Sequence, residues 1–127
     1  MSNVLSGERL IELLQRAGEQ REVAAGETIF DAGDPATEMY VVVAGTVDIV
    51  FDGRTVEVVG PNGIFGEMAL IESLPRNAGA RAQTDVVLTT IEARRFWFLV
   101  QETPYFAQYV MRVMSERLRQ TNALINR

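Results

Sequence analysis

Residues 63–78 read GIFGEMALIESLPRNA, and this stretch interrupts a region that otherwise has the pattern of β-strands. Its middle part, from Gly66 to Ser73, has the composition of a helix of one to two turns, which Pro75 stops. A short helix between strands leaves backbone N–H groups without partners in its first turn, and their partial positive charge suits an anion. Gly66 lets a ligand approach the backbone closely. The stretch therefore predicts an anion site within a β domain.

Arg76 follows Pro75 directly, where the chain returns to the β region. A guanidinium suits a phosphate because its planar fork donates two parallel hydrogen bonds and keeps its charge. An arginine after a proline is usually a solvated loop residue, and Glu67 alone would usually be a charge that offsets the helix dipole. The helix start and the arginine ten residues after Gly66 together favour a phosphate site.

Short runs rich in Val, Ile, Thr and Phe extend from Glu22 to Glu92 and are broken by turn residues at close intervals. Residues 47–51 alternate in the manner of a half-buried strand, and Asp52-Gly53 predicts a tight hairpin into residues 55–59. Several short strands with regular turns are typical of an antiparallel β-barrel of the jelly-roll kind. The expected fold class is mainly β with flanking helices.

Helical periodicity precedes and follows the β region. Apolar residues from Leu10 to Ala17 fall on one helix face, and Pro104 suits the first position of a long closing helix. That helix carries a seam that could pair with a second copy or fold over the β domain, formed by Met111, Met114, Leu118, Thr121 and Ile125. We expect one domain over residues 1–127, divided into an N-terminal helix (1–21), a β-barrel (22–93) and two C-terminal helices (94–127).

Composition narrows the function classes. The chain of 127 residues has no cysteine and no histidine, which removes thiolate and imidazole metal ligands and the usual general base. Its net charge of -5 disfavours a nucleic-acid partner. No run approaches the length of a membrane span, and the N-terminus lacks the features of a signal peptide. We expect a cytoplasmic protein without metal, cofactor, catalytic residues or direct membrane insertion.

The segments FGEMAL (65–70) and PRNA (75–78) resemble the phosphate-binding cassette of cyclic nucleotide-binding domains, which in this chain would extend from Phe65 to Ala82. That family includes catabolite activator proteins, regulatory subunits of protein kinase A and cyclic nucleotide-gated channels. The resemblance continues upstream through residues 26–29 and 33–34, Tyr40 and Gly45, and covers virtually the whole chain. It implies a cyclic nucleotide as ligand.

The resemblance also implies residue roles. Arg76 would bind the cyclic phosphate, with backbone amides near Gly66 and Ala69 completing the cradle. Glu67 would accept a hydrogen bond from the ribose 2′-hydroxyl, a role that suits a carboxylate because it is an acceptor only. Asn77 stands where relatives often have Ala, Ser or Thr against the phosphate, and Arg117 stands near an arginine that some channel relatives place against the base. The remaining ligand-binding residues that it implies are Phe65, Met68 and Ala78.

The resulting hypothesis is a stand-alone sensor that binds cyclic AMP in preference to cyclic GMP. Relatives that prefer cyclic GMP tend to have Thr at the position of Asn77. We expect no output domain on this chain, so the sensor would act on a separate protein effector, and a homodimer through the C-terminal helix is also expected. One alternative is a degenerate domain that keeps the fold without the ligand. The other is an enzyme on a similar β-barrel. Such enzymes hold their metal mainly with histidines, and this chain has none, so a barrel enzyme here would have to use no metal and is the less favoured alternative.

For two further features we prefer a purely structural interpretation over a functional one. Phe96, Trp97 and Phe98 invite a base-stacking role, but aromatic residues at helical spacing more often pack against other helices. Glu57 fits the polar side of a half-buried strand.

Overall fold

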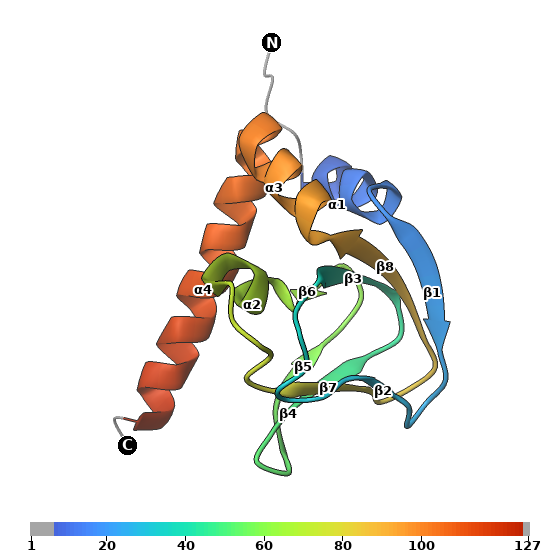
Figure 1. Cartoon of the computed structure of the whole chain (residues 1–127), viewed down its shortest axis with the longest axis vertical. Helices are drawn as coiled ribbons and strands as arrows, with labels where there is room; N and C mark the ends of the chain where they lie inside the picture. Colours follow the sequence, from blue (N-terminus) through green and yellow to red (C-terminus); the bar gives the residue numbers. More distant parts are fainter. Residues whose placement is uncertain (1–6, 126–127) are drawn as a thin grey trace.

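Two four-stranded antiparallel sheets form the centre of the computed structural model, which describes residues 7–125, with side-chain surroundings for residues 9–120 (Figure 1). The first sheet has the order β1-β8-β3-β6, with bounds Glu19–Val23, Val86–Glu92, Glu38–Ala44 and Ile64–Phe65. The second has the order β2-β7-β4-β5, with bounds Thr28–Phe30, Gly79–Ala82, Val47–Phe51 and Arg54–Val59. The mainly β fold with flanking helices is confirmed. The described strands form two sheets that do not close into a barrel, so the arrangement is jelly-roll-like without full closure.

The expected hairpin is present between β4 and β5. Phe51 pairs with Arg54 across the two-residue turn, and Asp52 and Gly53 both have positive φ angles, 53° and 75°. This is the backbone geometry that a two-residue turn of the Asp-Gly type requires. The hairpin extends from the second sheet and forms one wall of the site described below (Figure 1).

Four helices flank the sheets within the described chain; their bounds are Gly7–Arg16 (α1), Glu67–Glu72 (α2), Ala93–Glu102 (α3) and Pro104–Ile125 (α4). The expected N-terminal helix over residues 1–21 is too long, because β1 already begins at Glu19. Gly18 explains the early end: a Cβ there would lie 1.7 Å from the Thr90 carbonyl oxygen, so the chain turns closely onto β8 at this point. At the other boundary, α3 begins at Ala93, one residue before expectation.

The first sheet is the middle layer of the molecule. Along β3, Met39 and Val41 face the helices, whereas Tyr40 and Val42 face the second sheet. Both faces of this strand are buried, which explains why its sequence is apolar rather than alternating.

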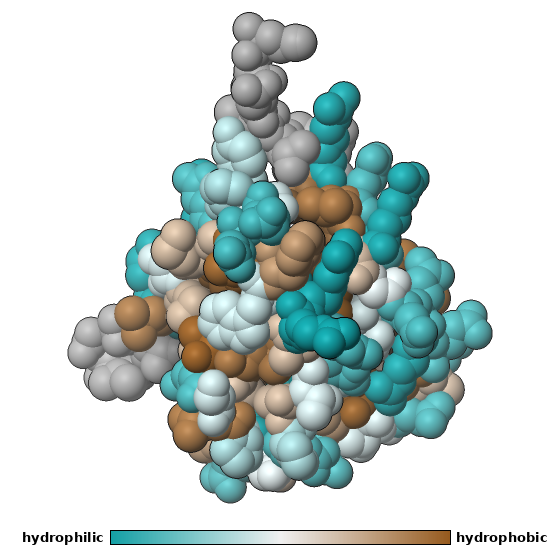
Figure 2. Space-filling view, turned by 45° about the horizontal axis from the view of Figure 1, so that its top comes forward, coloured by the Kyte–Doolittle hydropathy of each residue, from teal (hydrophilic) through white to brown (hydrophobic). Residues whose placement is uncertain are grey.

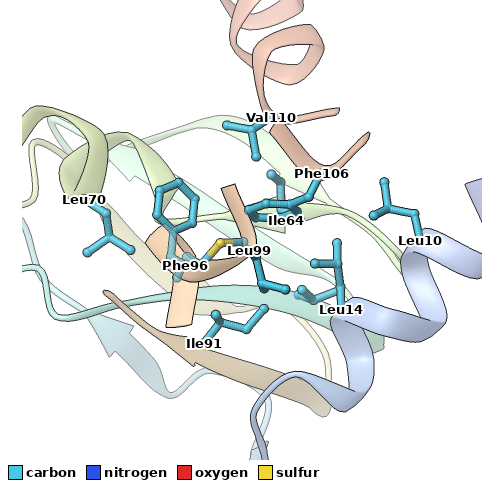
Figure 3. Packing of buried hydrophobic residues seen from close by; sticks show 11 residues of the cluster. Leu10, Leu14, Ile64, Leu70, Ile91, Phe96, Leu99, Phe106 and Val110 are labelled. Carbon is cyan, nitrogen blue, oxygen red and sulfur yellow. The ribbon is translucent and has the colours of Figure 1, made fainter. Parts of the chain in front are cut away.

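The helices share one apolar core over that sheet. Leu14 of α1, Phe96 of α3 and Phe106 of α4 belong to one buried cluster with Ile91 of β8 (Figure 3). Leu70 brings α2 into the same core, so the short helix of the cassette packs on the elements that carry α3 and α4.

Candidate functional site

A pocket of about 470 Å³ lies between α2, the β4–β5 hairpin and α4. The nine ligand-binding residues expected from the sequence all line it: Phe65, Gly66, Glu67, Met68, Ala69, Arg76, Asn77, Ala78 and Arg117. Six further residues complete the wall: Phe30, Ile49, Phe51, Val56, Glu57 and Gln120. The pocket thus has a polar end at the cassette and a more apolar end at the hairpin.

Arg76 is buried at the cassette end of the pocket, with 5% of its surface exposed. Its Nη1 donates to the Gly66 carbonyl oxygen and its Nη2 to the Glu38 carbonyl oxygen, both at 2.5 Å. No carboxylate among the described residues forms an ion pair with it. Burial is the main cause that lowers the pKa of Arg76 from its ordinary value. A guanidinium remains charged under such conditions, so this wall of the pocket carries a positive charge without a paired anion.

Gly66 stands at the start of α2 with a φ angle of 83°. A Cβ at this position would lie 3.0 Å from Nη1 of Arg76 and 3.2 Å from the Tyr40 ring. Glycine is therefore needed for two reasons, the left-handed backbone and the close approach of the guanidinium.

Glu67 is fully buried at 0% exposure on the same short helix. One carboxylate oxygen, Oε1, forms an ion pair with Nη1 of Arg117, while Oε2 has no hydrogen-bond partner. A buried carboxylate oxygen without a donor is costly in free energy, so Oε2 is an acceptor that a ligand hydroxyl would satisfy.

Arg117 connects three elements around the pocket. Besides Glu67 of α2, its Nε donates to Glu57 of β5 at 3.1 Å and its Nη2 to the Ile64 carbonyl oxygen at 2.6 Å. Burial alone would lower the pKa of Arg117, but the charges of Glu67 and Glu57 outweigh it and raise the pKa. Glu57 is consequently more than the polar side of a strand: it lines the pocket and ties β5 to α4.

The aromatic run of α3 lies outside this pocket. Phe96 is buried in the helical core, in edge-to-face contact with Phe106. Trp97 and Phe98 are about half exposed and do not line the pocket that holds Arg76. The preference for packing is thus confirmed for Phe96.

The closing helix α4 presents two different faces. Phe106 and Val110 are buried against the core, whereas Met111 and Leu118 of the expected seam are each 62% exposed. Thr121 and Ile125 lie outside the residues whose side chains are described. On the face of the molecule drawn in Figure 2, hydrophobic and hydrophilic residues are interspersed.

Sequence reasoning missed several residues that line or support the pocket, chiefly Phe30, Glu38 and Gln120. The guanidinium of Arg76 lies over the Phe30 ring, 4.1 Å from its centroid. The Glu38 contact is made by a backbone carbonyl, for which no side-chain signal exists in the sequence. The signal in the sequence that pointed to β2 was the resemblance of residues 26–29 to the strand and turn markers of cyclic nucleotide-binding domains.

The chain is similar in sequence to known cyclic nucleotide-binding proteins. The family description "Cyclic nucleotide-binding domain" matches residues 20–103. A CRP-like cAMP-activated global transcriptional regulator of Mycobacterium tuberculosis is 32% identical over 104 residues, which cover 76% of this chain and 46% of the regulator. The chain spans less than half the length of such curated relatives.

Two solved structures are similar over nearly the whole chain. The catabolite activator protein of Thermus thermophilus has a TM-score of 0.83 at 27% identity, covering 98% of this chain and 60% of that one. A structure from work on a cyclic-GMP-dependent signalling pathway in bacterial phytopathogenesis has a TM-score of 0.76 at 31% identity, covering 92% and 96%.

Within the part of the chain that the structure describes, no helix is long and apolar enough to cross a membrane. No three acidic side chains among the described residues converge as ligands for a metal ion.

Proposed function

Because the chain belongs to the cyclic nucleotide-binding domain family, we propose that it is a regulatory module that binds a cyclic nucleotide in the pocket lined by Arg76, Glu67 and Arg117. The observation that carries the proposal concerns two atoms. Among the described side chains, the buried polar atoms without a hydrogen-bond partner are Nε of Arg76 and Oε2 of Glu67. One is a cationic donor and the other an anionic acceptor, and both belong to residues of one pocket wall.

A ribose cyclic phosphate supplies the complementary groups. A phosphate oxygen accepts from the guanidinium, and the 2′-hydroxyl donates to the carboxylate. An inorganic phosphate would satisfy the first atom alone, and an uncharged nucleoside the second alone. This pairing supports a ribose cyclic phosphate as the ligand, and we place its phosphate among Gly66, Ala69, Asn77 and Ala78.

The base would occupy the hairpin end, between Ile49, Phe51 and Val56 on one side and Gln120 on the other. We propose cyclic AMP as the preferred ligand, because Asn77 replaces the Thr that is typical of relatives preferring cyclic GMP. The relative from M. tuberculosis is described as cAMP-activated, which supports this choice. The structure from the cyclic-GMP-dependent pathway makes cyclic GMP the competitor to test.

The output would pass through α4, because Arg117 joins this helix to the ribose-binding Glu67. A ligand shifts such a helix only through a difference in affinity between two helix positions. We propose that the module acts in the cytoplasm on a separate effector chain and that the exposed side chains of Met111 and Leu118 take part in a homodimer. If so, Leu118→Glu lowers the mass measured by sedimentation to that of a monomer.

Titration calorimetry with cyclic AMP, cyclic GMP, cyclic CMP and cyclic UMP tests the proposal. We expect one binding event per chain, strongest for cyclic AMP, and a matching rise in melting temperature. Absence of heat and of thermal stabilisation with all four compounds would instead favour the degenerate domain. A barrel enzyme would consume its ligand, so unchanged ligand recovered after incubation argues against that alternative.

A further inference from the structure

Arg76 has an unusual environment for a buried arginine. Buried guanidinium groups are normally paired with a carboxylate, because removing a charge from water is costly. Here the described residues provide two backbone carbonyl oxygens and electrostatic attraction from Tyr40, Glu38 and Glu67, but no ion pair. Something else must offset part of the cost of burying this charge before a ligand arrives.

The face of the guanidinium rests on an aromatic ring. The Arg76 Cζ atom lies 4.1 Å from the centroid of the Phe30 ring and 5.9 Å from that of Tyr40. Such positions are favourable because the ring face carries negative electrostatic potential, and the effect grows when the pair is shielded from water. Phe30 and Tyr40 are themselves stacked, with centroids 5.8 Å apart.

The aromatic group is held by its neighbours. Tyr40 stacks on Phe65, with centroids 4.9 Å apart, and its hydroxyl donates to the Glu38 carboxylate at 2.7 Å. The backbone oxygen of the same Glu38 accepts from Arg76. The ring face and the hydrogen-bond acceptor that locate the guanidinium therefore come from one packed unit of β2, β3 and β6.

We propose that Phe30 is a positioning residue that stabilises the buried charge of Arg76 through its ring face while leaving that charge available to an anionic ligand. A carboxylate in its place would neutralise the guanidinium and compete with a phosphate for the same N–H groups. A ring face stabilises the cation without occupying any donor. The unpartnered Nε of Arg76 is what this arrangement preserves.

This inference rests on the proposed function for its ligand, and its test uses cyclic AMP as the probe. Phe30 is replaced site-specifically by phenylalanine analogues with one, two and three ring fluorines, which change the shape little and weaken the potential of the ring face stepwise. We expect affinity to fall with each fluorine, by about twofold or more in total, because a guanidinium that the ring positions less firmly must be ordered by the ligand. The contact is present with and without the ligand, so most of its own energy cancels on binding. The matched control is the same series at Phe106, a buried ring in edge-to-face contact with Phe96 that does not line the pocket and has no contact with the guanidinium among the described residues.

A second measurement needs no ligand. Because the ring also stabilises the charge in the free protein, the melting temperature of the unliganded domain should fall along the Phe30 series more steeply than along the Phe106 series. A flat Phe30 series in both measurements, or equal slopes at the two positions, would overturn the inference. If the unmodified protein binds no cyclic nucleotide, the proposed function fails, and the melting series alone decides the role of Phe30.

Discussion

Two arginines face the same pocket, Arg76 buried and Arg117 half-buried, yet their surroundings are opposite. Arg117 has two carboxylates, Glu67 and Glu57, whereas Arg76 has two carbonyl oxygens and an aromatic ring. The ion pairs of Arg117 with Glu57 and Glu67 hold α4, β5 and α2 together. The charge of Arg76 has no paired anion among the described residues. We propose that the same kind of side chain is a structural tie on one wall and an anion receptor on the other.

The largest effect that separates the two arginines is expected for ligand affinity. Arg76→Met should weaken binding of cyclic AMP by about 3 kcal/mol or more, because two charge-assisted hydrogen bonds to the phosphate are lost. Calorimetry measures this loss. Arg81→Met is the control, since Arg81 lies close by on β7 but is half exposed and does not line the pocket. Equal affinities of the Arg76 variant and the unmodified protein would place the phosphate elsewhere.

The second effect concerns the free energy of unfolding, for which Arg117 should matter more than Arg76. Arg117→Met should lower the free energy of unfolding by about 2 kcal/mol, because it leaves the fully buried Glu67 without its counter-ion. Arg76→Met should cost less than Arg117→Met, since it removes a buried charge that had no paired anion. Urea denaturation measures both, with the exposed Arg112→Met as control on the same helix. The comparison is wrong if Arg76→Met is the more destabilising of the two.

A smaller effect sharpens the role of Glu67. Glu67→Ala should weaken binding of cyclic AMP by about 1 kcal/mol more than binding of 2′-deoxy cyclic AMP, because only the first ligand has a hydroxyl for Oε2. Since both ligands experience the same loss of the Arg117 ion pair, the difference between them isolates the hydroxyl. Equal losses would contradict the assigned hydrogen bond.

The smallest effect is expected for Glu57. Its side chain is about a third exposed, so solvent screens its attraction to Arg117. Glu57→Gln should lower the free energy of unfolding by about 0.5 kcal/mol, measured by urea denaturation. A loss as large as that of Arg117→Met would mean that Glu57, rather than Glu67, is the principal partner of the arginine.

Much of the site could be predicted because its residues are close in sequence. Gly66 and Glu67 start a short helix, and Arg76 follows the proline that ends the segment, so their spacing favoured one phosphate site. The other ligand-binding residues, distant Arg117 among them, were predicted from the resemblance to cyclic nucleotide-binding domains. Phe30 and Glu57 could not be found in this way, because their contacts depend on how β2 and β5 pack against the cassette and α4. Closure of the sheets was overestimated for the same reason, since turn spacing specifies strands and hairpins but not which edges meet.

The way in which α4 is attached has a consequence for its motion. Its first half is anchored by Phe106 and Val110 in the core, and Arg117 holds it further along through one guanidinium. Amide hydrogen exchange in the two halves should therefore report different events. We expect exchange in the first half of α4 to report opening of the whole domain. Exchange in the second half should report how often the Arg117 contacts break. If a ligand changes those contacts, the exchange rate of the second half would measure how much of the pocket is occupied.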